Sequence, residues 1–213
     1  MDLTYFTRII AISGSVLGLA GILMRLRQIM ERPFKRDLSR ERGSTRRGIL
    51  YAFTLGMAPW EKESTRTHWI AYIRGILFHV GVFTAFGVVF ASPWLYLIPF
   101  PIRLAAMLVT GAGALFGFAG IAIRLSGENE RALSLPDDYF AVFLTSLFTA
   151  LAFPVLLYSG WLPAFYLVFA LLMIYVPFGK IRHCVYFFYS KFFFGLGFGH
   201  RGVIGQSKGK YAE

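Results

Sequence analysis

Long apolar runs are the feature that most constrains how this 213-residue chain folds. Each approaches or exceeds the roughly 18–20 residues that an α-helix needs to cross about 30 Å of hydrocarbon. Only 15% of the residues are charged, whereas about a quarter would be charged in a soluble domain. The sequence therefore predicts an all-α membrane protein, a bundle of five transmembrane helices that forms a single membrane domain over 1–213. The expected spans are about 3–24, 74–95, 104–124, 138–158 and 161–183.

Lys and Arg are distributed unevenly among the connections between these runs. The segment 25–73 begins with the basic stretch RLRQIMERPFKRDLSRERGSTRR, the connection between the third and fourth expected spans adds Arg124 and Arg131, and the tail 184–213 is also basic. The connections near 92–101 and 159–163 hold essentially no basic residues. By the positive-inside rule, the N-terminus faces outward and the C-terminus lies in the cytoplasm, for a multi-pass protein of the cell's inner (cytoplasmic) membrane. This topology also accounts for the net charge of +11, so we expect no nucleic acid partner.

Two segments outside the spans are long enough to have a role of their own. Segment 25–73 is expected to be a solvated or headgroup-bound basic arm whose second half lies along the inner membrane interface. The alternative is a docking surface for an acidic soluble partner. The tail 184–213 is aromatic, then glycine-rich, then basic, and is expected to run along the inner surface as a cytoplasmic tail.

Two histidines lie within apolar runs, where ionisable residues are functional candidates because their burial in lipid is costly. His79 follows Gly75 by four residues and His183 follows Gly179 by four, so each histidine is expected to share a helix face with a glycine. The expected topology places both histidines at a similar depth in the inner leaflet, on helices of opposite direction. Imidazole is a common axial ligand of haem iron, and the glycines would leave room for the porphyrin. The pattern predicts one b-type haem; an interhelical hydrogen bond is the simpler alternative for each histidine.

Basic residues beside the two histidines are suited to the haem propionates. Arg74, Lys180 and Arg182 are expected at the inner surface, where they would pair with carboxylates. His68 and His200 are most simply exposed residues outside the spans, and a second haem between them is an open alternative.

Other kinds of site find little support in the sequence. The single cysteine, Cys184, excludes an internal disulfide and a Cys-ligated metal cluster. No phosphate-binding G-x-x-x-x-G-K-[ST] motif and no H-E-x-x-H motif occurs, so we predict no catalytic residue. Gly113 and Gly117 form a small-x-x-x-small pair of the kind that packs transmembrane helices. Asp137 or Asp138 is expected to cap the fourth span.

The blocks LFHVGVFTAFG, TGAGALFGFAGIAIR and VPFGKIRH, in a five-span arrangement, give the chain a family resemblance. It resembles the membrane cytochrome b subunits of the respiratory nitrate reductase gamma type, which include subunits of heterodisulfide reductase-like and sulfite-reduction-associated complexes. The resemblance covers the region 70–185. It implies that His79 and His183 bind the haem nearer a cytoplasmic Fe–S partner. The second, outer haem of that family has no matching ligands, because the corresponding positions lie around Val89 and Ala164 or Phe165.

The resemblance also implies a function. Arg103 stands at a position similar to a basic residue near the family's quinone site. The chain would then be a haem b electron-transfer subunit of a membrane-bound respiratory oxidoreductase, rather than an enzyme by itself. It would carry electrons between membrane quinone or quinol and a cytoplasmic Fe–S subunit, of the heterodisulfide reductase-like or a similar kind. The competing hypothesis is a haem-free membrane anchor or assembly subunit of a larger complex. A small transporter is disfavoured because no inverted repeat is present.

Overall fold

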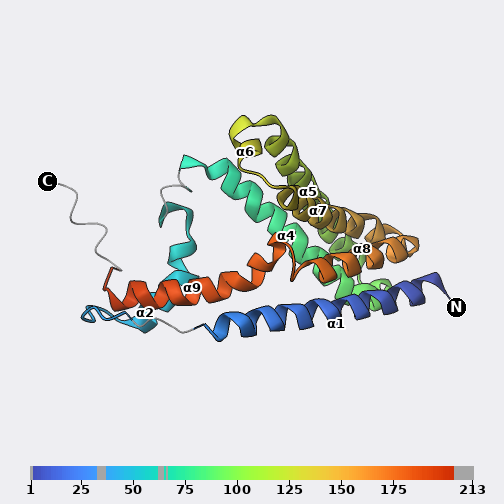
Figure 1. Cartoon of the computed structure of the whole chain (residues 1–213). Helices are drawn as coiled ribbons and strands as arrows, with labels where there is room; N and C mark the ends of the chain where they lie inside the picture. Colours follow the sequence, from blue (N-terminus) through green and yellow to red (C-terminus); the bar gives the residue numbers. More distant parts are fainter. Residues whose placement is uncertain (1, 33–36, 62–64, 66, 204–213) are drawn as a thin grey trace. The chain divides into compact units, whose positions relative to one another are not determined.

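The computed structural model describes most of the chain as helices. The described residues are 2–32, 37–61, 65 and 67–203. Within them every regular element is a helix (Figure 1). The end of the predicted tail, 204–213, and parts of the predicted basic arm, at 33–36, 62–64 and 66, lie outside the described residues.

The chain forms two compact units. The first unit consists of 1–25 and 73–182, and the second of 26–72 and 183–213. Both predicted flanking segments, 25–73 and 184–213, fall largely in the second unit.

Four helices of the described part are long and apolar enough to cross a membrane, and a broken pair of helices is a fifth candidate. The four are α1 (Leu3–Met30), α4 (Trp69–Ala91), α5 (Phe100–Ser126) and α7 (Pro136–Leu157). The broken pair comprises Ser159–Tyr175, which contains α8 (Leu162–Tyr175), and Lys180–His200, which contains α9 (His183–His200). These lengths confirm an all-helical protein with several candidate membrane spans.

The fifth span differs from its expected form as one straight helix over 161–183. Helix α8 ends at Tyr175, and a turn and the 3₁₀ helix η5 (Lys180–Arg182) follow before α9 begins at His183. Pro177 has no backbone N–H to continue the ladder, and proline is common just beyond a helix end. A span assigned from the average hydrophobicity of this region does not reveal the local break in the helix.

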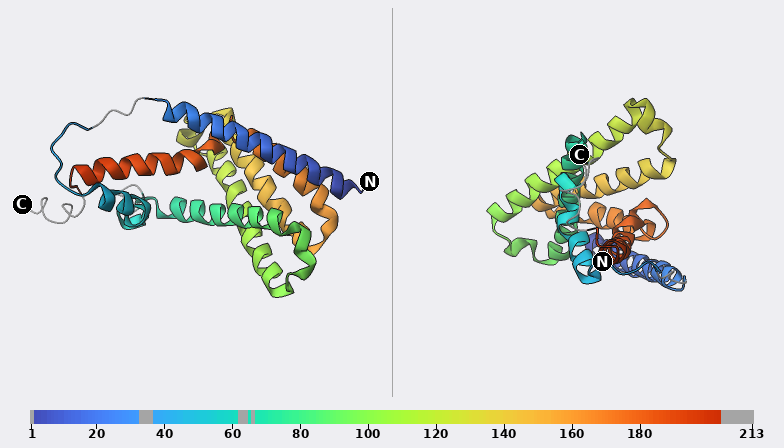
Figure 2. Two further views of the ribbon diagram at one scale, coloured as in Figure 1. Left: turned by 90° about the horizontal axis from the view of Figure 1, so that it is seen from below. Right: turned by 90° about the vertical axis from the view of Figure 1, so that its left-hand side faces the viewer.

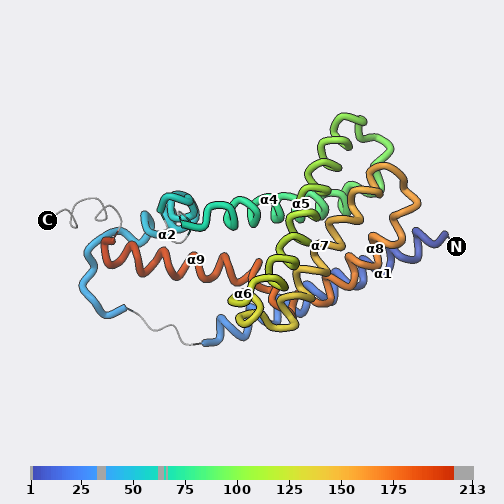
Figure 3. The backbone as a smooth tube through the Cα atoms, turned by 90° about the horizontal axis from the view of Figure 1, so that it is seen from above, coloured from blue at the N-terminus to red at the C-terminus, as the bar shows by residue number. Residues whose placement is uncertain are grey.

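In the first unit, α5 and α7 lie side by side and are joined by the short helix α6 (Glu128–Ala132), as Figures 2 and 3 show. Helix α8 packs on α7, and aromatic rings fill the space between them. The Phe148 and Phe165 rings, both fully buried, stack with centroids 5.1 Å apart. The ring of Phe86 from α4 contacts Phe148 edge-on at 5.2 Å. This cluster is the core of the unit.

Small residues bring the helices of the first unit into close contact. A Cβ atom at Gly113 of α5 would lie 2.6 Å from the Cα atom of Gly81 in α4. Gly117 packs against the Ser146 side chain of α7, and Gly14 of α1 lies against Ala170 of α8. The predicted packing role of Gly113 and Gly117 is thus confirmed, with α4 and α7 as the neighbours.

The second unit is built on the contact between α2 (Thr45–Phe53) and α9. Glycines line this contact: a Cβ atom at Gly48 would overlap the Gly195 carbonyl and lie 2.5 Å from the Gly199 Cα atom. Figures 1 and 3 show the two helices side by side. The 3₁₀ helices η1 (Leu55–Met57) and η2 (Pro59–Glu61) follow α2. The sequence predicted an arm and a tail as separate segments, but they pack on each other.

Polar contacts hold the end of α9 to the segment that precedes α2. The Arg201 guanidinium pairs with the Asp37 carboxylate at 2.8 Å, and the Arg42 backbone N–H donates to the His200 carbonyl at 2.8 Å. Gly202 has a positive φ of 66°, a conformation that favours glycine. The chain can therefore turn directly after α9 while these contacts form.

Candidate functional site

His79 lies on α4 in the first unit, and its side chain is exposed. Its Nδ1 atom is 2.6 Å from the Gly75 carbonyl oxygen, one helical turn earlier. When Nδ1–H donates this bond, Nε2 carries the lone pair of the imidazole. Metal-binding histidines are commonly oriented by such a bond from the other ring nitrogen to a backbone carbonyl. The geometry of His79 therefore suits an iron ligand.

The surface beside His79 is open at Gly75. A Cβ atom placed on Gly75 would meet no atom within 4 Å. The rings of Phe78 and Phe83 lie near the imidazole, with centroids 5.7 Å and 6.5 Å away. An exposed imidazole with a bare backbone patch one turn away and flanking rings fits one side of a flat macrocycle.

His183 is the first residue of α9, and its side chain is also exposed. It belongs to the second unit, whereas His79 belongs to the first. Gly179 precedes it in the turn after α8 and is buried, with the Tyr175 ring in the place where a Cβ atom would go. The expected helix face shared by Gly179 and His183 is therefore absent, because the helix ends at Tyr175.

Lys180 already has a carboxylate partner in the first unit. Its Nζ atom lies 2.6 Å from an Asp138 oxygen, and its backbone N–H donates to Asp137 at 3.1 Å. The Tyr175 hydroxyl also donates to Asp137. The N-cap residue of α7 is Leu135, and Asp138 in the first turn reaches back to accept the Leu135 N–H at 2.8 Å. One of the two predicted aspartates therefore does cap the start of α7, from inside the helix. These contacts tie the η5 turn to the start of α7.

Arg74 and Arg182 are half-buried residues of the first unit, on α4 and η5 respectively. Neither forms an ion pair within the part of the chain that the structure describes. Of the three cations predicted to pair with haem propionates, Lys180 alone has a carboxylate partner among the described residues.

The rings of His68 and His200 both make hydrogen bonds in the second unit. His68 Nδ1 lies 2.9 Å from the Thr67 hydroxyl, and His200 Nε2 lies 2.7 Å from the Ser39 carbonyl oxygen. The His200 contact is part of the anchoring at the end of α9. Among the described residues, no group of three or more His, Cys, Asp and Glu side chains could hold a metal ion. A haem with two axial histidines would not form such a group.

Arg103 lies near the start of α5 and is half-buried. Its Nη1 atom donates a long hydrogen bond of 3.4 Å to the Leu156 carbonyl near the end of α7. Its Nε atom is buried without a hydrogen-bond partner among the described residues, and the guanidinium lies 6.0 Å from the Phe100 ring centroid. Arg103 therefore keeps one buried donor without a hydrogen-bond partner among the described residues.

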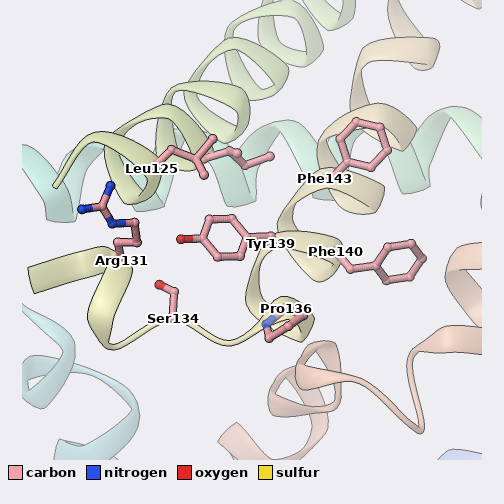
Figure 4. A pocket seen from close by; sticks show the side chains of 8 residues that line it. Leu125, Arg131, Ser134, Pro136, Tyr139, Phe140 and Phe143 are labelled. Carbon is pink, nitrogen blue, oxygen red and sulfur yellow. The ribbon is translucent and has the colours of Figure 1, made fainter. Parts of the chain in front are cut away.

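One surface feature has no counterpart in the sequence predictions. A groove opens between α5, α6 and α7, with the side chain of Arg131 at one end (Figure 4). It arises only when α5 and α7 pack side by side, because each helix contributes one wall. No spacing within either helix marks it in the sequence.

In comparisons with known proteins, no family model, curated protein or solved structure matches the chain. The resemblance to nitrate reductase gamma-type subunits therefore stays a prediction.

Proposed function

We propose that the protein is a haem b electron-transfer subunit of a membrane-bound oxidoreductase. The observation that carries this proposal is the arrangement at His79, where Nδ1 lies 2.6 Å from the Gly75 carbonyl and the Gly75 surface is open. An imidazole oriented in this way presents Nε2 for coordination. A second imidazole, that of His183, begins α9 with its side chain exposed.

In this proposal His79 and His183 supply the two axial nitrogens to one haem b. The haem supplies the electron transfer, and the protein supplies ligands, orientation and electrostatics. Arg74 and Arg182 are the cations proposed to pair with its propionates, because Lys180 is engaged by Asp138. The hydrogen bond from His79 to Gly75 would hold the imidazole in one tautomer.

The proposed electron partners are a membrane quinone and a cytoplasmic Fe–S protein of the heterodisulfide reductase-like or a similar kind. Arg103 is the residue proposed to lie beside the quinone, because it is half-buried near the start of α5 and its guanidinium makes only one long hydrogen bond among the described residues. The basic residues of the second unit support docking of an acidic soluble protein. The proposed location is the cytoplasmic membrane, with the N-terminus outside and the C-terminus in the cytoplasm.

The test is the optical spectrum of the purified protein. The wild type is expected to show a reduced-haem band, and His79→Ala and His183→Ala should each abolish it. His68→Ala is the control, because His68 lies outside the proposed ligand pair and should leave the band unchanged. A colourless wild-type protein, or a band that survives both ligand substitutions, would overturn the proposal.

A haem-free membrane anchor or assembly subunit is the second candidate. Two contacts favour this candidate. The Tyr175 ring fills the space beside Gly179 that was expected to hold the porphyrin, and Asp138 pairs with Lys180, which was expected to bind a propionate. This second candidate predicts no visible absorbance and unchanged complex formation after replacement of both His79 and His183. The same spectrum therefore separates the two candidates.

A further inference from the structure

We propose that the groove between α5, α6 and α7 in the first unit is a binding site for one anionic phospholipid. This site is separate from the proposed haem ligands. The groove has a volume of about 700 Å³, within the range of ordinary ligand sites. It is lined by Ile121, Leu125, Arg131, Ser134, Pro136, Tyr139, Phe140 and Phe143.

One wall of the groove is suited to an acyl chain. Leu125 from α5 and Phe140 and Phe143 from α7 are 55%, 44% and 47% exposed. They belong to two helices that are long and apolar enough to cross a membrane. Exposed apolar side chains on such helices would contact lipid hydrocarbon. This wall would therefore bind the acyl chain of a lipid rather than a polar group.

The other end of the groove is polar and positively charged. Arg131 is the one charged residue of the lining, and Ser134 and Tyr139 contribute hydroxyl groups. In Figure 4 the Tyr139 hydroxyl points toward the side where Arg131 lies. The Arg124 guanidinium adds a second positive charge there, since its Nη1 atom donates to the Ser134 hydroxyl at 3.0 Å.

The nearby carboxylates offset part of the Arg124 charge but leave Arg131 without a carboxylate partner in the described part of the chain. Asp138 is paired with Lys180 and also interacts electrostatically with Arg124, and neither Glu128 nor Glu130 of α6 lines the groove. Arg131 forms no ion pair among the residues that the structure describes. A phosphate would accept charge-assisted hydrogen bonds from the Arg131 guanidinium in place of water. The Ser134 and Tyr139 hydroxyls make this end polar, but they donate their own protons to the carbonyls of Glu130 and Arg124.

The position of the groove selects a phospholipid over a soluble anion. It lies where α5 ends and α7 begins, so its apolar wall faces the hydrocarbon and its polar end faces the headgroup layer. A phospholipid has the same two parts in the same order along the membrane normal. A zwitterionic headgroup carries a choline cation as well as a phosphate, and no carboxylate lines the groove to pair with that cation. A headgroup with a net negative charge is therefore favoured.

The experiment is native mass spectrometry of the full chain in detergent, titrated with phosphatidylglycerol or with phosphatidylcholine of the same acyl chains. The wild type is expected to retain phosphatidylglycerol preferentially. Arg131→Ala should weaken phosphatidylglycerol binding roughly tenfold, as for the loss of one charge-assisted contact, and remove the preference. Arg131→Lys should keep part of the preference for phosphatidylglycerol, because the positive charge remains while the planar guanidinium is lost.

Two further variants separate a defined site from general attraction to a basic protein. Arg40→Ala removes an exposed cation of the second unit and should leave both affinities unchanged. Phe143→Ala should weaken the binding of both lipids equally, because it removes part of the apolar wall that contacts the acyl chain. Equal retention of the two lipids by the wild type, or equal losses in Arg131→Ala and Arg40→Ala, would overturn the proposal.

Discussion

Polar side chains within the first unit mostly bond to their own helix. The buried hydroxyls of Thr110, Thr145 and Thr149 each donate to the carbonyl four residues earlier, at 2.7–2.9 Å. These bonds satisfy a hydroxyl that is buried within the protein. His79 makes the same kind of bond to Gly75 but is exposed on its apolar helix. The contrast supports a ligand role for His79.

Gly75→Leu tests that role without changing the ligand. If a macrocycle lies along the Gly75 surface, a leucine side chain there should lower the haem content severalfold. Gly87→Leu is the matched control on the same helix, because a Cβ atom at Gly75 or at Gly87 meets nothing within 4 Å. The pyridine haemochrome assay measures the haem content. Equal haem in the two variants would show that the Gly75 surface is not used.

The Asp37 carboxylate gives a pH dependence to the second unit. A hydrogen bond from the Ser39 N–H, followed by the Arg201 guanidinium, holds the pKa of Asp37 well below its ordinary value of 3.8. A lowered folded-state pKa stabilises the fold above the unfolded-state pKa, and this stabilisation is lost as the pH falls through the folded-state pKa. Asp37→Asn should therefore unfold at a lower temperature than the wild type at pH 7.

The difference between the two proteins should shrink as the pH falls below about 4, where the unfolded carboxyl becomes protonated. Thermal unfolding followed by circular dichroism in detergent at pH 7 and pH 3 measures it. Arg201→Gln should reproduce part of the effect, because it removes the ion pair but leaves the Ser39 contact. A difference that stays constant with pH would contradict the assignment.

At the scale of elements, the first four spans could be predicted because each is a continuous apolar run. Their observed bounds differ by a few residues: α1 continues to Met30, and α4 begins at Trp69. The break after Tyr175 was missed because the fifth span was extended through Pro177 to position 183, although Lys180 and Arg182 follow the proline. The sequence also did not predict the packing of α2 on α9, since the glycines that allow it lie far apart in the chain.

The α2–α9 contact predicts opposite effects for two alanine substitutions. At Gly48 the added methyl would overlap backbone atoms of Gly195 and Gly199, so Gly48→Ala should destabilise the second unit by roughly 1–3 kcal/mol. At Gly197 the added methyl meets nothing within 4 Å, and alanine favours the helix, so Gly197→Ala should stabilise it by roughly 0.5–1 kcal/mol. Limited proteolysis and thermal unfolding measure both. Equal shifts in the two variants would contradict this packing.

At the scale of the molecule, the sequence identified two histidines but not the units that carry them. His79 lies in the first unit and His183 in the second, and this division depends on the α2–α9 packing. Lys180 was predicted to serve a cofactor, but Asp138 engages it because the turn after α8 lies against the start of α7. Charge and spacing along the chain suggest candidates, whereas carboxylate partners and neighbouring rings depend on the packing of distant segments.

The membrane topology is the last prediction, and the proposed cytoplasmic partner depends on it. Single cysteines introduced into a Cys184→Ser background report on each connection, since Cys184 is exposed and would otherwise react. Tyr96, Tyr158 and Leu133 are 80%, 68% and 84% exposed, so a cysteine at each would be accessible. With the N-terminus outside, a membrane-impermeant maleimide should label Tyr96→Cys and Tyr158→Cys in intact cells. Leu133→Cys should react only after permeabilisation.

The reverse labelling pattern would place the basic connections outside and contradict the positive-inside assignment. It would also turn His79 and His183 toward the outer leaflet, and a cytoplasmic Fe–S protein could then not be the direct electron partner. The phospholipid groove would still lie at a headgroup layer, because it follows the end of α5 on whichever side that end lies. The labelling pattern therefore tests the proposed partner independently of the proposed lipid site.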